Sequence, residues 1–152
     1  RHLFQGKAQD LGRRQGRAEV VAGLGSGSIL LDEIALRHPE LRIVIAHMGH
    51  PWFDEAIAVI RRHRHVYADV SALVGRRWLL YQALVSAVEY RTEHKLLFGT
   101  DYAFFTARQT IDGLRSVTGA AFGPGLPVVD EQVVEDIIHR PTLELLGITR
   151  PS

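Results

Sequence analysis

The sequence predicts an α/β domain in which about three parallel strands alternate with helices. Short apolar runs at 42–46, 66–70 and 95–98 are typical of strands buried on both faces, as strands in parallel sheets are. Between these runs, apolar residues recur three and four positions apart, which is the periodicity of helices that cover a sheet. Consecutive strand–helix–strand units form a parallel sheet with right-handed connections.

Local patterns define each element in turn. Residues 1–27 contain scattered glycine and basic residues and are predicted to be loop or an irregular connection. The predicted helices cover residues 29–37, 53–62, 78–90, about 107–117 and 130–138. Pro39 stops the first helix, and a Gly/Pro loop occupies residues 119–127. A last short helix begins at Pro141 and ends at Gly147.

The composition is that of an ordinary globular domain. Of the 152 residues, 46% are hydrophobic and 23% are charged, and a net charge of +1 gives no field that would attract nucleic acid or an anionic membrane. No apolar run approaches the length of a membrane span, and no signal peptide opens the chain. The absence of cysteine fits a cytoplasmic protein. Because the first residue is Arg1 and not Met, we expect a processed chain or a fragment.

Titratable side chains follow two of the predicted strands, at the point where each strand ends. His47 comes directly after the run 42–46, and Asp101 follows the run 95–98. In barrels and open α/β folds, the residues just past the carboxyl ends of the strands carry the chemistry. We therefore expect His47 and Asp101 to be catalytic and to face a common cleft. The alternatives are a hydrogen-bonded core histidine and an aspartate that caps the next helix.

Neighbouring side chains complete the expected pocket. His50, Trp52 and Tyr102 are candidates for substrate binding, although Trp52 is equally able to seal the top of the core. Asp69 and Ser71 point the same way along the strand 66–70 and are able to reach the pocket mouth. The alternative for Asp69 is that it accepts hydrogen bonds from the residues that line the pocket and does not reach the pocket itself.

Basic residues elsewhere have simpler explanations. Arg76 and Arg77 could clamp a substrate carboxylate, but we expect a solvated helix start. The only His-x-His motif, at 63–65, lies just before a strand and hence on the edge of the sheet opposite His47. We expect it to be a solvated turn, because barrels keep stabilising residues on that side.

Three ordered motifs and a closing helix resemble the amidohydrolase-2 family of the amidohydrolase superfamily. They are PELRIVIAHMGHPW at 39–52, VYADVS at 66–71, KLLFGTDY at 95–102 and LELLGI at 143–148. Members of this family are distorted (β/α)8 barrels that bind a divalent metal, often zinc. They hydrolyse, hydrate or decarboxylate small carboxylated or aromatic substrates. The resemblance covers residues 28–148 and excludes the irregular start at 1–27.

The resemblance implies the C-terminal portion of a TIM-type (β/α)8 barrel, with residues 1–152 as a single partial barrel domain. A complete barrel needs about 250 residues. The predicted strands would correspond to the sixth, seventh and eighth, His47 to the sixth-strand histidine, and Asp101 to the aspartate that meets the metal and its water. The implied activity is that of a metal-dependent hydrolase or lyase acting on a small molecule.

Two family features are missing from the sequence. The family begins with a His-x-His on its first strand and has another metal-binding histidine after the fifth, and neither is recognisable here. A catalytic zinc site needs about three protein ligands and an open position. We therefore expect the isolated chain to be inactive and to bind zinc weakly or not at all.

A partial barrel is also expected to need a partner. We expect Ile43, Ile45, Leu96 and Phe98 to contribute to an apolar face that would meet the missing strands, and hence a homo-oligomer or a partner carrying the N-terminal half. One alternative function is a non-catalytic half-barrel that docks on a partner or on itself. Another is a small α/β domain with a metal-independent hydrolase site, against which the absence of a Gly-x-Ser-x-Gly motif counts.

Overall fold

The computed structural model describes residues 19–21 and 29–148, and its centre is a parallel sheet. The strands β1 (Glu19–Val21), β2 (Ile43–Ile45), β3 (Val66–Asp69) and β4 (Leu96–Leu97) lie in the order β1-β2-β3-β4, and each neighbouring pair is parallel. Sequence order and spatial order therefore coincide, as they do in a segment of a (β/α)8 barrel.

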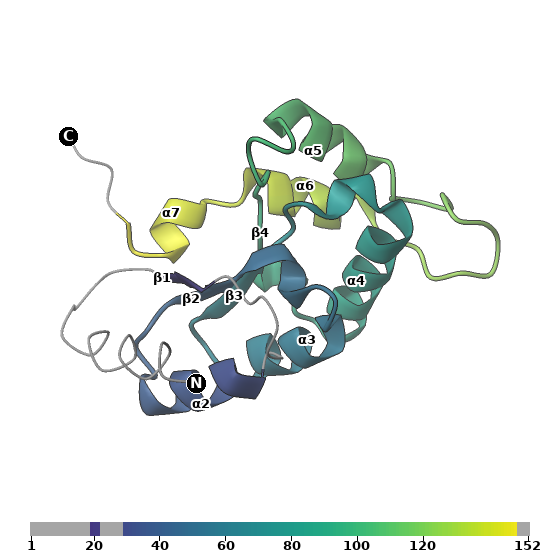
Figure 1. The fold of residues 1–152 in the computed structure, drawn as a ribbon. Coiled ribbons are helices and arrows are strands. Elements are labelled where there is room, and N and C mark those ends of the chain that lie inside the picture. The colour runs from purple at the N-terminus through teal and green to yellow at the C-terminus, as the bar shows by residue number, and fades with distance from the viewer. Residues whose placement is uncertain (1–18, 22–28, 149–152) are drawn as a thin grey trace.

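Helices connect and cover these strands. They are α2 (Ile29–Arg37), α3 (Phe53–Arg62), α4 (Arg77–Glu89), α5 (Ala107–Arg115), α6 (Glu131–His139) and α7 (Thr142–Leu145). In Figure 1, α2 and α3 lie below the strands, α4 lies to the right of the strands next to α3, and α5 and α6 lie above β4. Among the described helices, none combines the length and the apolar character needed to cross a bilayer.

The predicted fold class is confirmed, with one strand more than expected. The three predicted strands are present but shorter than their apolar runs, and α2 and α3 have the predicted bounds. The prediction of loop over residues 1–27 is wrong at Glu19–Val21, which pairs with Ile43–Ile45. A three-residue strand shows no alternation of its own, so only the neighbouring strand reveals it. The rest of that region lies outside the described residues.

The main core lies between the sheet and the helices. Ile43, Ile45 and Leu96 are buried there with the apolar faces of the surrounding helices, and Phe98 packs against the same cluster. The expectation that these four residues face missing barrel strands is therefore wrong. Side chains alternate between the two faces of a strand, and the odd positions of β2 point toward the helices.

The opposite face of the sheet has its own cover. Val44, Tyr67 and Leu97, one from each of three strands, are buried with Leu146 just past α7. The chain turns at Gly147 (φ 65°), where a Cβ would lie 2.9 Å from the nearest guanidinium nitrogen of Arg42. Glycine is favoured at this position for its left-handed conformation, and a side chain here would also displace the end of Arg42. The closing segment thus lies next to the residue that precedes β2.

The amino-terminal edge of the sheet is held by polar contacts. The Nε2 atom of His63 lies 2.7 Å from Oδ1 of Asp32, and Arg62 donates to the same carboxylate at 3.0 Å. The Nζ atom of Lys95 donates to the backbone oxygens of Ile60 at 2.8 Å and His63 at 2.5 Å. The expectation of a solvated turn is wrong for His63, whose side chain is only 12% exposed, because it joins α2 to the end of α3.

Candidate functional site

The chain leaves β2 through a turn of unusual backbone conformation. His47 (φ 55°, ψ 35°), Met48 (φ 51°, ψ 26°) and Gly49 (φ 76°) all lie in the left-handed region. Each non-glycine residue in this conformation costs about 1–2 kcal/mol. Met48 is fully buried and anchors the turn in the core, so the packing of the core holds His47 in a conformation that it would not adopt alone.

Two residues of the β3 end hold His47 in place. The Nδ1 atom of His47 lies 2.8 Å from Oγ of Ser71, and the backbone N–H of His47 donates to Oδ1 of Asp69 at 3.1 Å. The same Oδ1 accepts from the backbone N–H of Ser71 at 3.0 Å and from its hydroxyl. Asp69 is therefore a hydrogen-bond acceptor behind the histidine, and Ser71 is the contact that joins the two side chains.

This arrangement fixes which nitrogen of His47 carries the proton. An ionised carboxylate only accepts, so the hydroxyl hydrogen of Ser71 points to Asp69. The Ser71 oxygen is then the acceptor for the Nδ1–H of His47. In the neutral imidazole, Nε2 is consequently the unprotonated nitrogen, and among the described residues it has no hydrogen-bond partner.

The end of β4 approaches the same residues closely. A Cβ at Gly99 would lie 3.3 Å from Cβ of Ser71 and 3.4 Å from Cβ of Asp69. The contact with Ser71 is tighter than an ordinary van der Waals distance, so a larger residue at position 99 would push against the support of His47. Asp101, two residues further on, therefore leaves the sheet at the edge that carries His47.

Asp101 also has a left-handed backbone (φ 58°) and lines a hollow of about 450 Å³. The hollow lies between the β3–α4 and β4–α5 connections and is lined by Ala72, Gly75, Arg76, Asp101, Phe104 and Phe105. The helix that follows, α5, is capped by Thr106, whose Oγ1 accepts from the backbone N–H of Gln109. The alternative role of Asp101 as a helix cap is therefore wrong.

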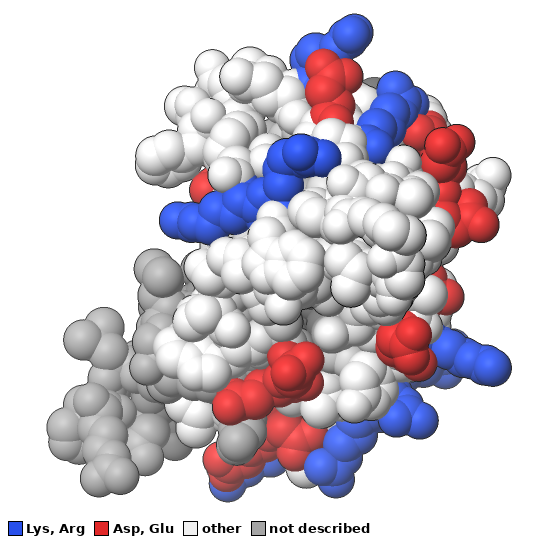
Figure 2. Space-filling model, turned by 90° about the vertical axis from the view of Figure 1, so that its right-hand side faces the viewer, with Lys and Arg blue, Asp and Glu red and all other residues white. Residues whose placement is uncertain are grey.

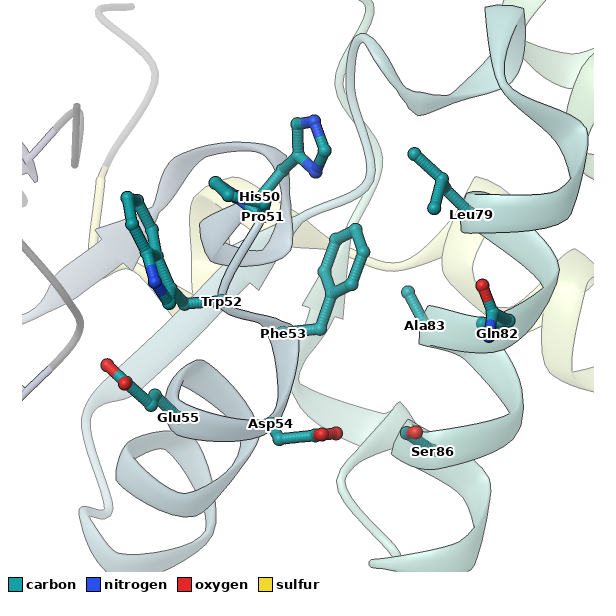
Figure 3. A pocket seen from close by; sticks show the side chains of 10 residues that line it. All are labelled: His50, Pro51, Trp52, Phe53, Asp54, Glu55, Leu79, Gln82, Ala83 and Ser86. Carbon is teal, nitrogen blue, oxygen red and sulfur yellow. The ribbon is translucent and has the colours of Figure 1, made fainter. Parts of the chain in front are cut away.

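His50 and Trp52 line a different hollow, of about 490 Å³, between the start of α3 and α4 (Figure 3). Phe53 stacks on the His50 ring at 5.4 Å between centroids, and Ala83 and Gln82 of α4 form the opposite wall. Trp52 is 40% exposed and does not seal the core, so that alternative is wrong.

Nearby groups act on the charge of His50. Burial lowers its pKa from the ordinary 6.5, and the positive charge of Arg76 lowers it further. Arg76 therefore lies within electrostatic reach of His50 while it lines the hollow of Asp101. Tyr102, the remaining candidate, is 83% exposed and is not among the residues that line either hollow.

The described residues do not fit a complete metal site. Within 19–21 and 29–148, no three histidine or acidic side chains gather closely enough to hold an ion. Zinc needs about three protein ligands. Asp101 is a candidate for one of them, and the Nδ1 of His47 is already engaged with Ser71.

Charged side chains give no sign of a nucleic-acid surface on the face shown in Figure 2. Uncharged residues cover its middle, and basic and acidic side chains are mixed around its edges. A stripe of basic residues, as proteins use to follow phosphates, is absent from this view.

Comparison with known proteins bears on the fold and the family. The family model described as Amidohydrolase matches residues 25–148. An uncharacterised TIM-barrel protein from Bordetella bronchiseptica superposes with a TM-score of 0.62 at 22% identity, over 97% of this chain and 50% of that one. The 5-carboxyvanillate decarboxylase LigW from Sphingomonas paucimobilis superposes with a TM-score of 0.51 at 17% identity, over 80% of this chain and 38% of that one. The chain thus spans half the length of the first structure and 38% of the length of the second. Among curated proteins, none matches the sequence.

Proposed function

Because the chain belongs to the amidohydrolase family, whose pattern spans residues 25–148, we propose that it forms part of the active site of a hydrolase or decarboxylase. The proposed substrate is a small carboxylated or aromatic molecule. The observation that carries this proposal is the hydrogen-bonded series His47–Ser71–Asp69 at the sheet edge from which Asp101 also emerges.

His47 is proposed to move the proton. Its Nδ1–H is held by Ser71, so Nε2 is free to accept a proton from water or to return one to a carbon or a leaving group. Both reactions need such a group, since hydrolysis protonates a leaving group and decarboxylation protonates the carbon that loses CO2. Imidazole suits the task because it exchanges protons near neutral pH.

Asp101 is proposed to act beside it as a proton acceptor or as one ligand of a divalent metal, for which we propose zinc. The described residues offer no complete metal site, so the other ligands would have to come from outside them. They would be supplied by further strands of the barrel, either in a partner carrying the N-terminal half or in a second copy of the chain. LigW, a structural neighbour, is a decarboxylase.

A second candidate is a non-catalytic half-barrel that docks on a partner. The incomplete set of metal ligands among the described residues favours it. The two candidates differ in what the His47 and Asp101 side chains do: a docking module tolerates their replacement, whereas an enzyme does not.

The test is to express the open reading frame that encodes this chain and to measure CO2 release and hydrolysis of aromatic acids and esters with added Zn²⁺ or Mn²⁺. We expect His47→Asn and Asp101→Asn to lower kcat/KM by at least about 100-fold, the usual contribution of a general acid or base. His94→Asn and Asp112→Asn, at exposed positions, are the matched controls and should retain activity. Full activity in both site variants would refute the assigned roles.

A further inference from the structure

The hollow beside Asp101 has the chemistry of an anion site with aromatic walls. It combines one cation, Arg76, one anion, Asp101, and the rings of Phe104 and Phe105 in a space of about 450 Å³. Phe104 is 81% exposed, whereas Phe105 packs against the core. A Cβ at Gly75 would lie 3.1 Å from Cζ of Phe105, so the glycine leaves room for that ring.

Arg76 is fixed at its backbone and free at its side chain. Its N–H donates to the backbone oxygen of Leu73 at 2.8 Å, and its own oxygen accepts from the N–H of Leu80 at 3.0 Å. These bonds hold the residue at the junction between the β3–α4 connection and α4. Across the part of the chain that the structure describes, its guanidinium takes part in no hydrogen bond or ion pair.

The adjacent arginine, in contrast, has hydrogen-bond partners for its guanidinium. Arg77 donates to Oγ of Ser116 at 3.1 Å and to its backbone oxygen at 2.7 Å, and its guanidinium lies 5.5 Å from the ring centre of Phe122. Arg77 therefore ties α4 to the end of α5. The two arginines were expected to share one role as a solvated helix start, and the structure separates them.

The position of Arg76 relates it to one of the candidate catalytic residues. It lines the hollow that Asp101 lines. An anion bound by the guanidinium would thus lie beside Asp101 at the carboxyl edge of the sheet. A planar guanidinium with free donors matches a carboxylate through two parallel hydrogen bonds.

Resting on the function proposed above, we propose that Arg76 binds the carboxylate of a planar aromatic acid whose ring lies against Phe104 and Phe105. This assignment narrows the substrate class to aromatic carboxylates and gives the hollow beside Asp101 its role. A single carboxylate neutralises Arg76, and the aromatic walls accept the ring with little cost because they are already apolar.

The test is a binding measurement on the 152-residue chain with benzoate as the probe and benzamide as its uncharged analogue, by NMR titration at low ionic strength. We expect Arg76→Gln to weaken benzoate binding by about tenfold or more, as the loss of a charge-assisted pair does. Arg76→Lys should bind benzoate with intermediate strength, because it keeps the charge and loses the fork. Phe104→Ala should weaken benzoate more than it weakens acetate.

Arg64→Gln is the matched control, since it makes the same change of charge at an exposed position next to the opposite end of β3. It should leave benzoate binding unchanged. The proposal is overturned if benzoate fails to bind the unmodified chain, if benzamide binds equally well, or if Arg64→Gln and Arg76→Gln weaken binding equally. Urea midpoints of the variants establish that each is folded.

This measurement separates the inference from the function on which it rests. If benzoate binding depends on Arg76 but the protein expressed from the open reading frame shows no turnover, the enzymatic role is refuted and the anion site is retained. Turnover that depends on His47 and Asp101 but is indifferent to Arg76→Gln, together with unchanged benzoate binding, would refute the anion site alone.

Discussion

Replacing Asp69 by alanine tests whether its carboxylate organises the end of β3 and the turn that carries His47. A single oxygen, Oδ1, accepts hydrogen bonds from the backbone of His47 at 3.1 Å, from the backbone of Ser71 at 3.0 Å and from the Ser71 hydroxyl. Asp69→Ala removes all three. It leaves two backbone N–H groups without their acceptor, one of them in Ser71, which is 3% exposed.

The expected magnitude follows from these contacts. A hydrogen bond to a charged group contributes about 1.5–3 kcal/mol, and a buried donor left unpaired costs about 1–3 kcal/mol. The three bonds share one acceptor and are not additive, and the Asp69 side chain is 19% exposed, so water replaces part of the loss. We expect Asp69→Ala to lower the free energy of unfolding by about 3–5 kcal/mol, a large share of the roughly 5–15 kcal/mol typical of a domain.

Asp69→Asn is the matched control, because an amide keeps an oxygen at the Oδ1 position and loses only the charge. Neutral hydrogen bonds are about half as strong as charge-assisted ones, so the expected loss is about 1–2 kcal/mol. Urea unfolding, followed by tryptophan fluorescence and circular dichroism, gives both values. Equal losses in the two variants, or a loss below about 1 kcal/mol in Asp69→Ala, would refute the role of Oδ1 as the organising acceptor.

Other expectations concern pH, packing and assembly. Burial, reinforced by nearby positive charges, places the pKa of His50 and of His65 below the ordinary 6.5. The unfolded chain therefore takes up protons first, so the urea midpoint should fall as the pH drops from about 7 to 5.5, and a midpoint that rises would contradict this. Gly113→Ala should destabilise by about 1–3 kcal/mol despite the better helix propensity of alanine, because its Cβ would lie 2.6 Å from Cβ of Val74. In a Val74→Gly background, which removes that Cβ, the same change should cost much less. Light scattering should show an oligomer at micromolar concentration, because β1 and β4 are the two edges of the described sheet and strand edges favour pairing. A cooperatively unfolding monomer of 17.0 kDa would refute the need for a partner.

Much of the fold could be predicted from the sequence because α3, α5 and α6 are strongly amphipathic and the strands are apolar. The apolar positions of α3 predict its bounds, Phe53–Arg62, directly. The placement of His47 and Asp101 past strand ends was also visible, because a polar residue ends each apolar run. Whether these two side chains are catalytic remains a prediction that the variants above test.

What the sequence could not show depends on register. The pairing of Ile45 with Ala68 sets Ser71 beside His47, and nothing local to either segment encodes that pairing. The distinction between Arg76 and Arg77 likewise depends on where Ser116 comes to lie, 39 residues further along the chain from Arg77. The strand β1 is too short to show a recognisable pattern in the sequence, and only its pairing with β2 defines it.

The position of the closing segment has a consequence for how a ligand could enter. Leu146 covers Val44, Tyr67 and Leu97 on the face that would line the interior of a closed barrel, and Gly147 lies against Arg42 at the amino end of β2. This end of the interior therefore has a floor of aliphatic side chains. We therefore expect small molecules to enter a barrel completed on this sheet from the other end, where His47 and Asp101 lie.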